Sequence, residues 1–472
     1  MKLIRTLLPV LVTALLAPIV QGAVTLTTLY SFSGSDGANP AGGLVQGADG
    51  NFYGTTSQSG FTNQYGTVFR ITPGGTFTNL YRLNGASDGA WPELGLVLGS
   101  DGNFYGTTAY RGANFKGTIF KATSSGGFST LVALDSFSGS PGSLLVPGTD
   151  GNLYCVGNFG FGTGLGSVFR VSPDGVVNNL ASFDGTDGFT GWSFSSDFLL
   201  QGTEGNFYGA TDYGGPEFNG EFVNPAYGTV FKMAPDGTLT TLASFNGTNG
   251  AYVAALTQGR DGNLYGTTDS GGPAFIDDPQ FGGQGGYGTV FKLTTNGTLT
   301  TLALFNGTNG KGPTSLIQAS DGNFYGTTYS GGTNGGRGTV FRLTGDGTLT
   351  SLFSFNGTNG AVPDFATLLQ APDGSFYGTT KSGGVSNKGT IFRLELTPQA
   401  PLFQTVTRTG DALTFIWSAV SGKSYQVQHT IDLIQTNWSD LGIPITATNA
   451  TATASDNVGP DRQRFYRIVL LP

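Results

Sequence analysis

The chain has 472 residues, of which 79 are Gly and only 11% are charged, whereas ordinary proteins use roughly 7% Gly and about 25% charged residues. The Gly residues follow no Gly-X-Y period and there are only 21 Pro, which excludes a collagen. Hydrophobic residues reach 38% and include 36 Phe and 18 Tyr, too much apolar surface for a disordered chain. The composition indicates a turn-rich, aromatic-rich, all-β protein.

The first 22 residues have the pattern of a secretory signal peptide. Lys2 and Arg5 form the charged start, Leu7 to Val20 form the apolar stretch, and the small residues Val20 and Gly22 predict cleavage after Gly22. The apolar stretch is short for a membrane anchor, and no later segment approaches the roughly 18 apolar residues of a transmembrane helix. We therefore expect a secreted protein, extracellular or on the outer cell surface, without membrane insertion after cleavage.

The net charge limits the classes of partner, and the cysteine content limits how the fold is stabilised. Cleavage would remove two of the 22 basic residues and leave 20 against 30 acidic ones, a net charge of −10. Such a surface repels phosphate backbones, so no nucleic-acid partner is expected. The single Cys, Cys155, allows no internal disulfide, so packing must supply the stability. We expect a monomer.

Internal repeats dominate the sequence, because three motifs each occur seven times in fixed order. The motif Asp-Gly-Asn-Phe-Tyr-Gly-Thr-Thr and its variants begin at Asp49, Asp101, Asp150, Glu204, Asp261, Asp321 and Asp373. The motif Gly-Thr-Val-Phe-Arg/Lys begins at Gly66, Gly117, Gly166, Gly228, Gly288, Gly338 and Gly389. A third, similar to Thr-Leu-Thr-Thr-Leu-Ala-Ser-Phe, begins at Thr25, Thr76, Gly127, Val176, Thr238, Thr298 and Thr348.

Each repeat predicts four strands. In the second repeat, residues 95–98, 103–108 and 117–121 form the first three, and an Asp-Gly pair turns the chain between the first two. Seven such units predict a seven-bladed β-propeller over residues 23–397. The chain opens with a fourth-strand motif and the last repeat lacks one, so the N-terminal strand is expected to close the ring. An open β-solenoid is the alternative.

The repeats also resemble a known family. Asp-Gly-Asn-Phe-Tyr-Gly-Thr-Thr, Gly-Thr-Val-Phe-Lys-Leu and Leu-Ala-Ser-Phe-Asn-Gly together are similar to the Gloeo/Verruco (GloVer) tandem repeat of secreted bacterial proteins, over residues 25–397. The resemblance implies a choice-of-anchor secreted protein, in which varied C-terminal modules follow the repeats. It implies no particular activity. The spaced Tyr and Trp of kelch repeats are absent.

The pattern changes after the Pro-rich stretch 398–401. Residues 413–417, 425–429 and 464–469 alternate as strands, and Trp417 with Tyr466 suits the core of a small β-sandwich. Residues 398–472 resemble the fibronectin-III-like module that ends many secreted bacterial proteins. This module either serves attachment or sorting, or the protein is released.

Several forms of chemistry find no support in the repeats. The only His, His429, lies outside them and is expected at the surface, so the predicted propeller has no imidazole for catalysis or metal binding. Cys155 replaces a Gly of the second-strand motif and is expected to be a packed small residue. One basic residue follows the Phe of every third strand, and we expect these residues to pair with the turn Asp rather than with a ligand.

Departures from the repeat mark the candidate site. The loops between strands two and three and between successive repeats should share one face, which is long and variable. Aromatic and acidic residues there predict glycan recognition through ring stacking and hydrogen bonds. The candidate ligand-binding residues are Trp91, Trp192, Tyr213, Glu217, Phe218, Glu221, Asp277, Asp278 and Phe281. The four carboxylates could also hold Ca²⁺, but no ordered ligand spacing supports it, so no cofactor is expected.

Three functions remain open. We favour a secreted, non-enzymatic protein that binds a glycan or a cell-surface protein on its variable face. A structural or adhesive envelope protein is the alternative, in which the insertions are merely ordered loops and both Trp are packed beneath them. A polysaccharide-acting enzyme is the third, and paired carboxylates over a central funnel would favour it.

Overall fold

The computed structural model describes residues 24–40, 42–59, 65–135, 139–158, 164–190, 198–216, 218, 227–276, 284–364, 367–396, 401, 403–419, 423–431, 437–449, 451–458 and 464–471. The predicted signal peptide, residues 1–22, lies outside them. The chain divides into two compact units. One comprises Leu26–Glu395, and the other comprises Leu396–Pro472 together with Met1–Thr25.

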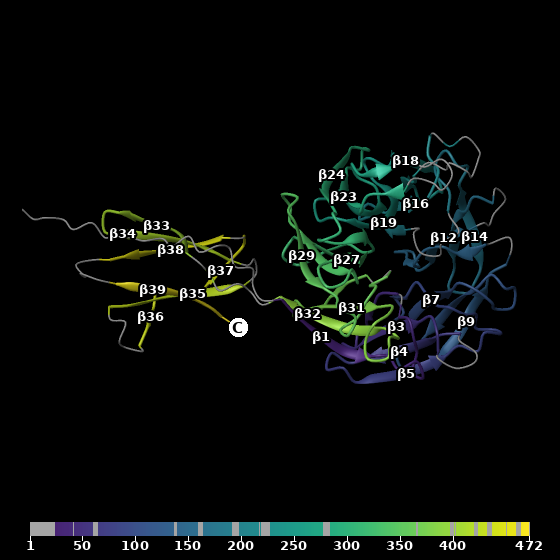
Figure 1. Ribbon diagram of the computed structural model, residues 1–472, viewed down its shortest axis with the longest axis horizontal. Coiled ribbons are helices and arrows are strands. Elements are labelled where there is room, and N and C mark those ends of the chain that lie inside the picture. Colours follow the sequence, from purple (N-terminus) through teal and green to yellow (C-terminus); the bar gives the residue numbers. More distant parts are fainter. Residues whose placement is uncertain are drawn as a thin grey trace, which may run out of the picture. The chain divides into compact units, whose positions relative to one another are not determined.

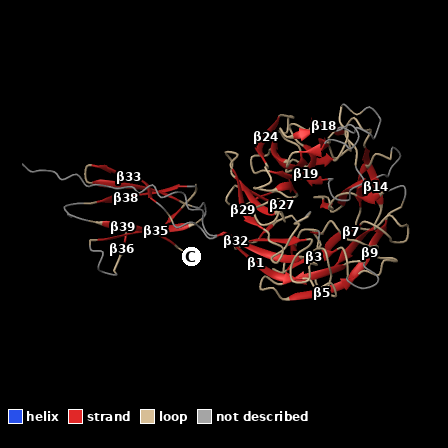
Figure 2. Ribbon diagram, viewed as in Figure 1, coloured by secondary structure: helices blue, strands red, loops and turns tan. Residues whose placement is uncertain are grey.

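Strands and turns make up the described residues, which contain no helix (Figure 2). The all-β prediction is confirmed. No helix in this part of the chain is therefore long and apolar enough to cross a membrane. Figure 1 shows the sheets of Leu26–Glu395, coloured from purple to green, arranged around a common centre. Seven antiparallel sheets of four or five strands occupy the described residues of this unit, and we number them in chain order. Six are made from consecutive parts of the chain, and the seventh also includes the N-terminal strand.

Sheet 1 contains β2 (Val45–Gln46), β3 (Phe52–Thr56), β4 (Thr67–Ile71) and β5 (Phe77–Arg82). Sheet 2 contains β6 (Leu96–Leu98), β7 (Phe104–Thr108), β8 (Thr118–Ala122) and β9 (Phe128–Ala133). Sheet 3 contains β10 (Ser140–Pro141), β11 (Val146–Pro147), β12 (Leu153–Asn158), β13 (Ser167–Val171) and β14 (Val177–Ser182). Sheet 4 contains β15 (Phe198–Gln201), β16 (Phe207–Thr211), β17 (Thr229–Met233) and β18 (Leu239–Ser244).

Sheet 5 contains β19 (Ala251–Gln258), β20 (Leu264–Ser270), β23 (Thr289–Leu293) and β24 (Leu299–Leu304). A small ribbon of β21 (Phe275–Ile276) and β22 (Gln284–Gly285) lies between β20 and β23 in the sequence. Sheet 6 contains β25 (Lys311–Pro313), β26 (Ile317–Gln318), β27 (Phe324–Ser330), β28 (Thr339–Leu343) and β29 (Leu349–Ser354). Sheet 7 contains β30 (Leu369–Gln370), β31 (Phe376–Thr380), β32 (Thr390–Leu396) and the N-terminal β1 (Val24–Ser31).

The Asp-Gly turn between the first two strands of a sheet holds a repeated polar network. In sheet 2, Asp101 accepts hydrogen bonds from the Tyr105 hydroxyl at 2.9 Å and from Lys121 Nζ at 2.8 Å. Gly102 follows with φ +76°, a conformation that Gly adopts without strain. Burial alone would raise the pKa of Asp101, but the hydrogen bonds from Lys121, Asn103 and Tyr105 hold it below its usual range.

The predicted pairing of third-strand cations with turn carboxylates is confirmed in three sheets. The pairs are Lys121–Asp101, Lys292–Asp261 and Arg393–Asp373, each within one sheet. These ion pairs are partly exposed, so they contribute less than about 1 kcal/mol each. Cys155 is fully buried, as expected for a packed small residue.

Neighbouring sheets join through the Tyr of one second strand and the Phe of the next. The ring centroids of these pairs are 4.1 Å apart for Tyr53–Phe104, 4.3 Å for Tyr154–Phe207, 4.2 Å for Tyr265–Phe324, 4.5 Å for Tyr325–Phe376 and 4.2 Å for Tyr377–Phe52. The last pair joins sheet 7 to sheet 1. At the remaining two boundaries Leu153 and Leu264 replace Phe, and each shares a buried cluster with the preceding Tyr.

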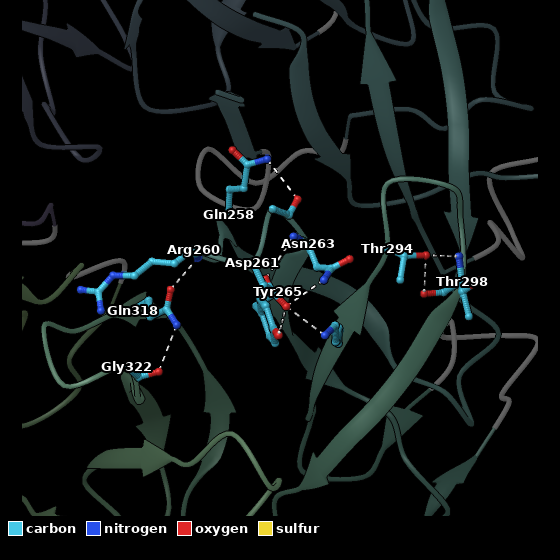
Figure 3. A network of polar contacts seen from close by, with 11 residues as sticks. Gln258, Arg260, Asp261, Asn263, Tyr265, Thr294, Thr298, Gln318 and Gly322 are labelled. Atoms are coloured by element: carbon cyan, nitrogen blue, oxygen red, sulfur yellow. Dashed lines mark hydrogen bonds and ion pairs between the residues drawn. The ribbon is translucent and has the colours of Figure 1, made fainter. Parts of the chain in front are cut away.

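A Gln at the end of the first strand links adjacent turns (Figure 3). Gln318 donates through Nε2 to the Gly322 carbonyl at 3.0 Å and accepts from the Arg260 amide of sheet 5 at 2.8 Å. The same arrangement joins sheets 3 to 4, 4 to 5 and 6 to 7. Three boundaries lack this link. Where sheet 1 meets sheet 2 and sheet 2 meets sheet 3, Leu98 and Pro147 replace the Gln. Where sheet 7 meets sheet 1, Gln46 is present, but Pro372 has no backbone N–H that could donate to it.

The N-terminal strand belongs to the last sheet. β1 pairs with β32, and the Phe32 amide donates to the Gly389 carbonyl at 3.0 Å. Beyond β1, the Asn39 amide donates to the Lys388 carbonyl at 2.9 Å. Residues 349 and 357 positions apart in the sequence therefore lie side by side.

The C-terminal unit has two antiparallel sheets that share one core. The first contains β33 (Phe403–Thr409), β34 (Ala412–Ser418) and β38 (Thr451–Asn457). The second contains β35 (Ser424–Thr430), β36 (Ser439–Asp440), β37 (Ile445–Thr446) and β39 (Phe465–Leu470). Trp417 is fully buried in this core and Tyr466 packs against it, as expected. His429 is half-buried beside Tyr466 rather than at the surface, because it pairs in β35 opposite that residue.

Candidate functional site

A cavity of about 710 Å³ opens in the Leu26–Glu395 unit. It is lined by the ends of the first and second strands of sheets 4 to 7 and by the segment that leads into sheet 2. The lining residues are Glu93, Asp212, Tyr213, Tyr252, Val253, Ala254, Asp269, Lys311, Gly312, Thr314, Tyr329, Ser330, Asp364 and Lys381. Its size and its mixture of aromatic and charged groups are typical of a small-ligand site.

Four of the lining residues occupy one repeat position, directly after the Thr-Thr pair of the second strand, which is Ala210-Thr211 in sheet 4. These are Asp212, Asp269, Tyr329 and Lys381 in sheets 4 to 7, while sheets 1 to 3 have Ser57, Ala109 and Asn158 there. The preceding Thr is buried and bonds to the first Thr of the third strand in each of sheets 4 to 7, at 2.8 to 3.0 Å between hydroxyls. A uniform scaffold thus presents Asp in sheets 4 and 5, Tyr in sheet 6 and Lys in sheet 7.

An ion pair lies at the sheet 7 side of the cavity. Lys381 Nζ donates to Asp364 at 2.8 Å, and Asp364 is only 4% exposed. Burial raises the pKa of Asp364 in spite of Lys381, and the charge of Asp269 raises it further. Burial also raises the pKa of Glu93, where Lys381 lowers it and Asp364 raises it. The charges of Glu93, Asp364 and Lys381 therefore influence one another across the cavity lining.

Tyrosine rings supply the apolar part of the lining. Tyr213 and Tyr252 meet edge to face with centroids 5.4 Å apart, and Tyr213 also stacks on Phe189 at 5.4 Å. Tyr329 is 46% exposed. Sugar rings stack on such aromatic faces, while carboxylates and amines bond their hydroxyls.

Near the start of the first strand, several sheets have one residue in the left-handed backbone conformation. Trp91 and Tyr252 both have φ +60°, and their amides donate to the carbonyls of Tyr65 and Tyr227 in the preceding sheet. Asn39 and Gly312 occupy the same repeat position in sheets 1 and 6. A bulky side chain at this φ costs of order 1–2 kcal/mol. Aromatic residues are therefore placed there at the expense of stability.

Gly312 leaves room for an acidic neighbour. Its φ is +61°, and a Cβ at this position would lie 2.9 Å from Asp269 Oδ1. The missing side chain lets the Asp269 carboxylate lie over the first strand of sheet 6. The residue at this repeat position thus controls the width of the cavity as well as its chemistry.

The amide of Trp91 bonds to the carbonyl of Tyr65, so the loops between sheets and the loops between second and third strands share one face, as expected. Tyr213 lines the cavity. Trp91 is 42% exposed, packs edge to face on Tyr110 and lies two residues from Glu93. Phe218 covers Gly185 and contacts Phe189, a packing position. Trp192, Glu217, Glu221, Asp277, Asp278 and Phe281 lie outside the described residues.

Most of the lining was not predicted. Glu93, Tyr252, Lys311, Tyr329, Asp364 and Lys381 were missed, and Asp212 and Asp269 served only as the bounds of insertions. The available signal was the repeat position after Thr-Thr, where residue type changes from sheet to sheet. The prediction was based on the long insertions instead of on this repeat position.

The described residues include no group of three or more His, Cys, Asp or Glu side chains that could hold a metal ion. The carboxylates proposed for Ca²⁺, Glu217, Glu221, Asp277 and Asp278, lie outside the described residues. Calcium binding there stays a prediction.

Repeated four-stranded antiparallel sheets with a ligand-sized cavity at the ends of their first two strands define a β-propeller built from tandem repeats. The family model of the Gloeobacter/Verrucomicrobia repeat matches residues 18–223 and 279–417, and the chain belongs to this family. The resemblance inferred from the three motifs is confirmed. None of the curated proteins matches the sequence.

Solved structures with a similar fold share little sequence with this chain. A puromycin hydrolase is 13% identical with a TM-score of 0.47, over 82% of this chain and 60% of that one. PorZ, a surface component of the type-IX secretion system of Porphyromonas gingivalis, is 12% identical with a TM-score of 0.47, over 92% and 57%. An ulvan lyase, a polysaccharide lyase, is 9% identical with a TM-score of 0.46, over 76% and 94%. Such distant likenesses carry no argument about activity.

Proposed function

We propose that this protein is a secreted glycan-binding protein whose site is the cavity between Glu93 and Lys381. One observation carries the proposal. The side chains that vary between repeats converge on a single cavity and combine tyrosine rings with hydrogen-bonding charges. Sugar recognition needs both, because a pyranose has an apolar face and a rim of hydroxyls.

The architecture proposed with it is a closed ring of seven blades, residues 23–397, after a cleaved signal peptide 1–22. The pairing of β1 with β32 supports it, as does the Tyr377–Phe52 contact, which repeats the geometry of the other boundaries. Residues 398–472 are proposed as a fibronectin-III-like module that serves attachment or sorting. We propose a monomer on the cell surface or released from it.

Retention on immobilised polysaccharides tests the proposal. Tyr252→Asn removes a cavity ring and places at φ +60° the residue that stands there in sheet 1, so the backbone should be undisturbed. We expect the original protein to be retained and this variant to elute early, with an affinity loss of about tenfold or more.

The matched control is Phe115→Ala. Phe115 is a 75% exposed aromatic outside the cavity lining, and its loss should leave retention unchanged. Equal retention of the two variants would place the site elsewhere. If no polysaccharide retains the original protein, the structural or adhesive role takes precedence over glycan binding.

One observation favours a polysaccharide-acting enzyme as a second candidate. Glu93 faces the cavity, and burial with the nearby Asp364 raises its pKa, a property of carboxylic acids that donate a proton in catalysis. In this case Glu93→Gln would abolish the release of product from a retained polysaccharide while binding persists. Without product from the original protein, this candidate fails.

A further inference from the structure

The charges of the cavity are unbalanced. Its described lining carries four carboxylates against two amines and has no Arg or His. The carboxylates are Glu93, Asp212, Asp269 and Asp364, and the amines are those of Lys311 and Lys381. The excess is negative, in a protein whose sequence already has a net charge of −8.

The lysines offset only part of this excess. Lys381 is engaged by Asp364 at 2.8 Å, and Glu93 also raises the pKa of Lys381. Lys311 is exposed at the edge of the cavity, and its Nζ lies 6.0 Å from the centre of the Tyr287 ring. An anionic ligand would thus meet Glu93, Asp212 and Asp269, and of the two amines only that of Lys311 is not already paired with Asp364.

Two of the carboxylates, the partly buried Glu93 and the buried Asp364, lie near other charged groups. Burial and neighbouring carboxylates raise the pKa values of Glu93 and Asp364 above those of ordinary acids. A cation between these groups would lower the repulsion, because opposite charges favour the ionised form. A uronate or a sulfated sugar would increase it, and such like-charge contacts strongly suppress binding.

Aromatic faces complete the recognition of an amine. Tyr213, Tyr252 and Tyr329 line the same cavity, and tyrosine faces attract ammonium groups when these lie within about 6 Å of the ring centroid. A metal ion would need several oxygen ligands together, and the described residues offer no such group. An organic cation that carries its own hydroxyls fits better.

We infer that the cavity selects a saccharide with a free primary amine, a hexosamine whose nitrogen is not acetylated, and rejects uronic acids. This inference rests on the proposed glycan-binding function and names its ligand class. The ammonium would lie among Glu93, Asp269 and the tyrosine rings. Acetylation would remove its charge and with it the interaction.

Calorimetric titration of the purified protein with three hexasaccharides tests this inference. The probes are a glucosamine hexamer, its fully N-acetylated form and a galacturonic acid hexamer, in EDTA-containing buffer at low salt. We expect the glucosamine hexamer to bind about tenfold tighter than the acetylated form or better, and the galacturonate not to bind. Added salt should weaken the first interaction most.

Two variants assign the preference to the cavity. Asp269→Asn and, separately, Glu93→Gln should each remove most of the preference for the free amine, while Asp236→Asn, in an exposed turn of sheet 4, should keep it. Two substitutions guard against a folding defect in either one.

The outcomes separate the two proposals. Equal binding of the free and acetylated hexamers, or binding of galacturonate alone, overturns the amine preference and leaves glycan binding standing. A preference that survives both cavity variants overturns the assignment to these carboxylates. If neither these probes nor any immobilised polysaccharide binds, both proposals fall.

Discussion

The Asp-Gly turns and the cavity lie at opposite ends of the same strands, and they differ in how the repeats treat them. At the turns, an Asp accepts hydrogen bonds from the same Asn and Tyr positions in sheets 1, 2, 3, 5 and 6, as Tyr53 to Asp49 at 2.7 Å and Tyr325 to Asp321 at 2.8 Å illustrate. At the cavity, one repeat position holds Asp, Tyr or Lys according to the sheet. Uniform residues therefore maintain the fold, and varied residues mark the site.

Substitutions that remove the contacts between sheets should cause the largest losses of stability, because these contacts are made by the residues that recur in the repeats and maintain the fold. Phe52 is fully buried against Tyr377, and Phe52→Ala should lower the free energy of unfolding by about 3–5 kcal/mol. Chemical denaturation measures this loss. Phe376→Ala, at the boundary of sheets 6 and 7, is the matched substitution. A much smaller loss for Phe52→Ala would argue against a closed ring.

A substitution in the Asp-Gly turn network should lower the free energy of unfolding less, and by an amount that depends on pH. Asp101→Asn weakens the bonds from Tyr105 and Lys121 and should cost about 1–2 kcal/mol at neutral pH, since the site is partly exposed. The folded pKa of Asp101 lies below its ordinary 3.8, so its stabilisation is present above that pH and is lost as the pH falls through the folded value.

Thermal unfolding of both proteins across the acid range measures this difference. The gap between their melting temperatures should narrow as the pH falls below 3.8. A gap that stays constant would show that Asp101 acts through packing and not through its charge. Asp236→Asn, in an exposed turn where the carboxylate accepts a hydrogen bond from the Thr238 amide, should have a smaller effect.

The smallest effect concerns an Asp in the loop after sheet 3. Burial raises the pKa of Asp187 to about 6, and the equivalent Asn249 donates to the Ser244 carbonyl at 3.4 Å. Only the protonated acid could copy that bond. Its stabilisation is full below the ordinary pKa of 3.8 and declines as the pH rises to about 6.

Asp187→Asn should therefore raise the melting temperature at pH 8 and change it little at pH 4. The gain corresponds to less than about 1 kcal/mol, because the group is partly exposed. Asn249→Asp, the converse change in the next sheet, should lower stability at pH 8 only. Equal effects of Asp187→Asn at both pH values would contradict this explanation.

The sequence predicted the fold and the family because local signals repeat. In sheet 2 the predicted strands 95–98, 103–108 and 117–121 match β6, β7 and β8 closely. The strands of each sheet pair mainly with strands of the same repeat, so they could be predicted from the sequence of one repeat alone. The number of blades and the closing of the ring depend on contacts between distant residues and remain proposals.

The cavity could be predicted only in part because it forms between repeats. Glu93, Tyr252 and Lys381 come from three sheets and share no local motif. Their proximity follows from the register of strands that the sequence does not display. Of the predicted residues in the sheet 4 insertion, Tyr213 lines the cavity and Phe218 packs on Gly185, while those outside the described residues stay predictions. The changing residue after Thr-Thr was the better signal.

Parallel measurement of glycan affinity and melting temperature for Tyr252→Asn and Asp101→Asn tests the division between scaffold and site most directly. We expect Tyr252→Asn to lose about tenfold or more in affinity while its melting temperature changes by only a few degrees. Asp101→Asn should lower the melting temperature. At temperatures below its own melting point, this variant should bind the glycan with the original affinity. Affinity losses that simply follow the loss of stability in both variants would contradict a separate site at the cavity.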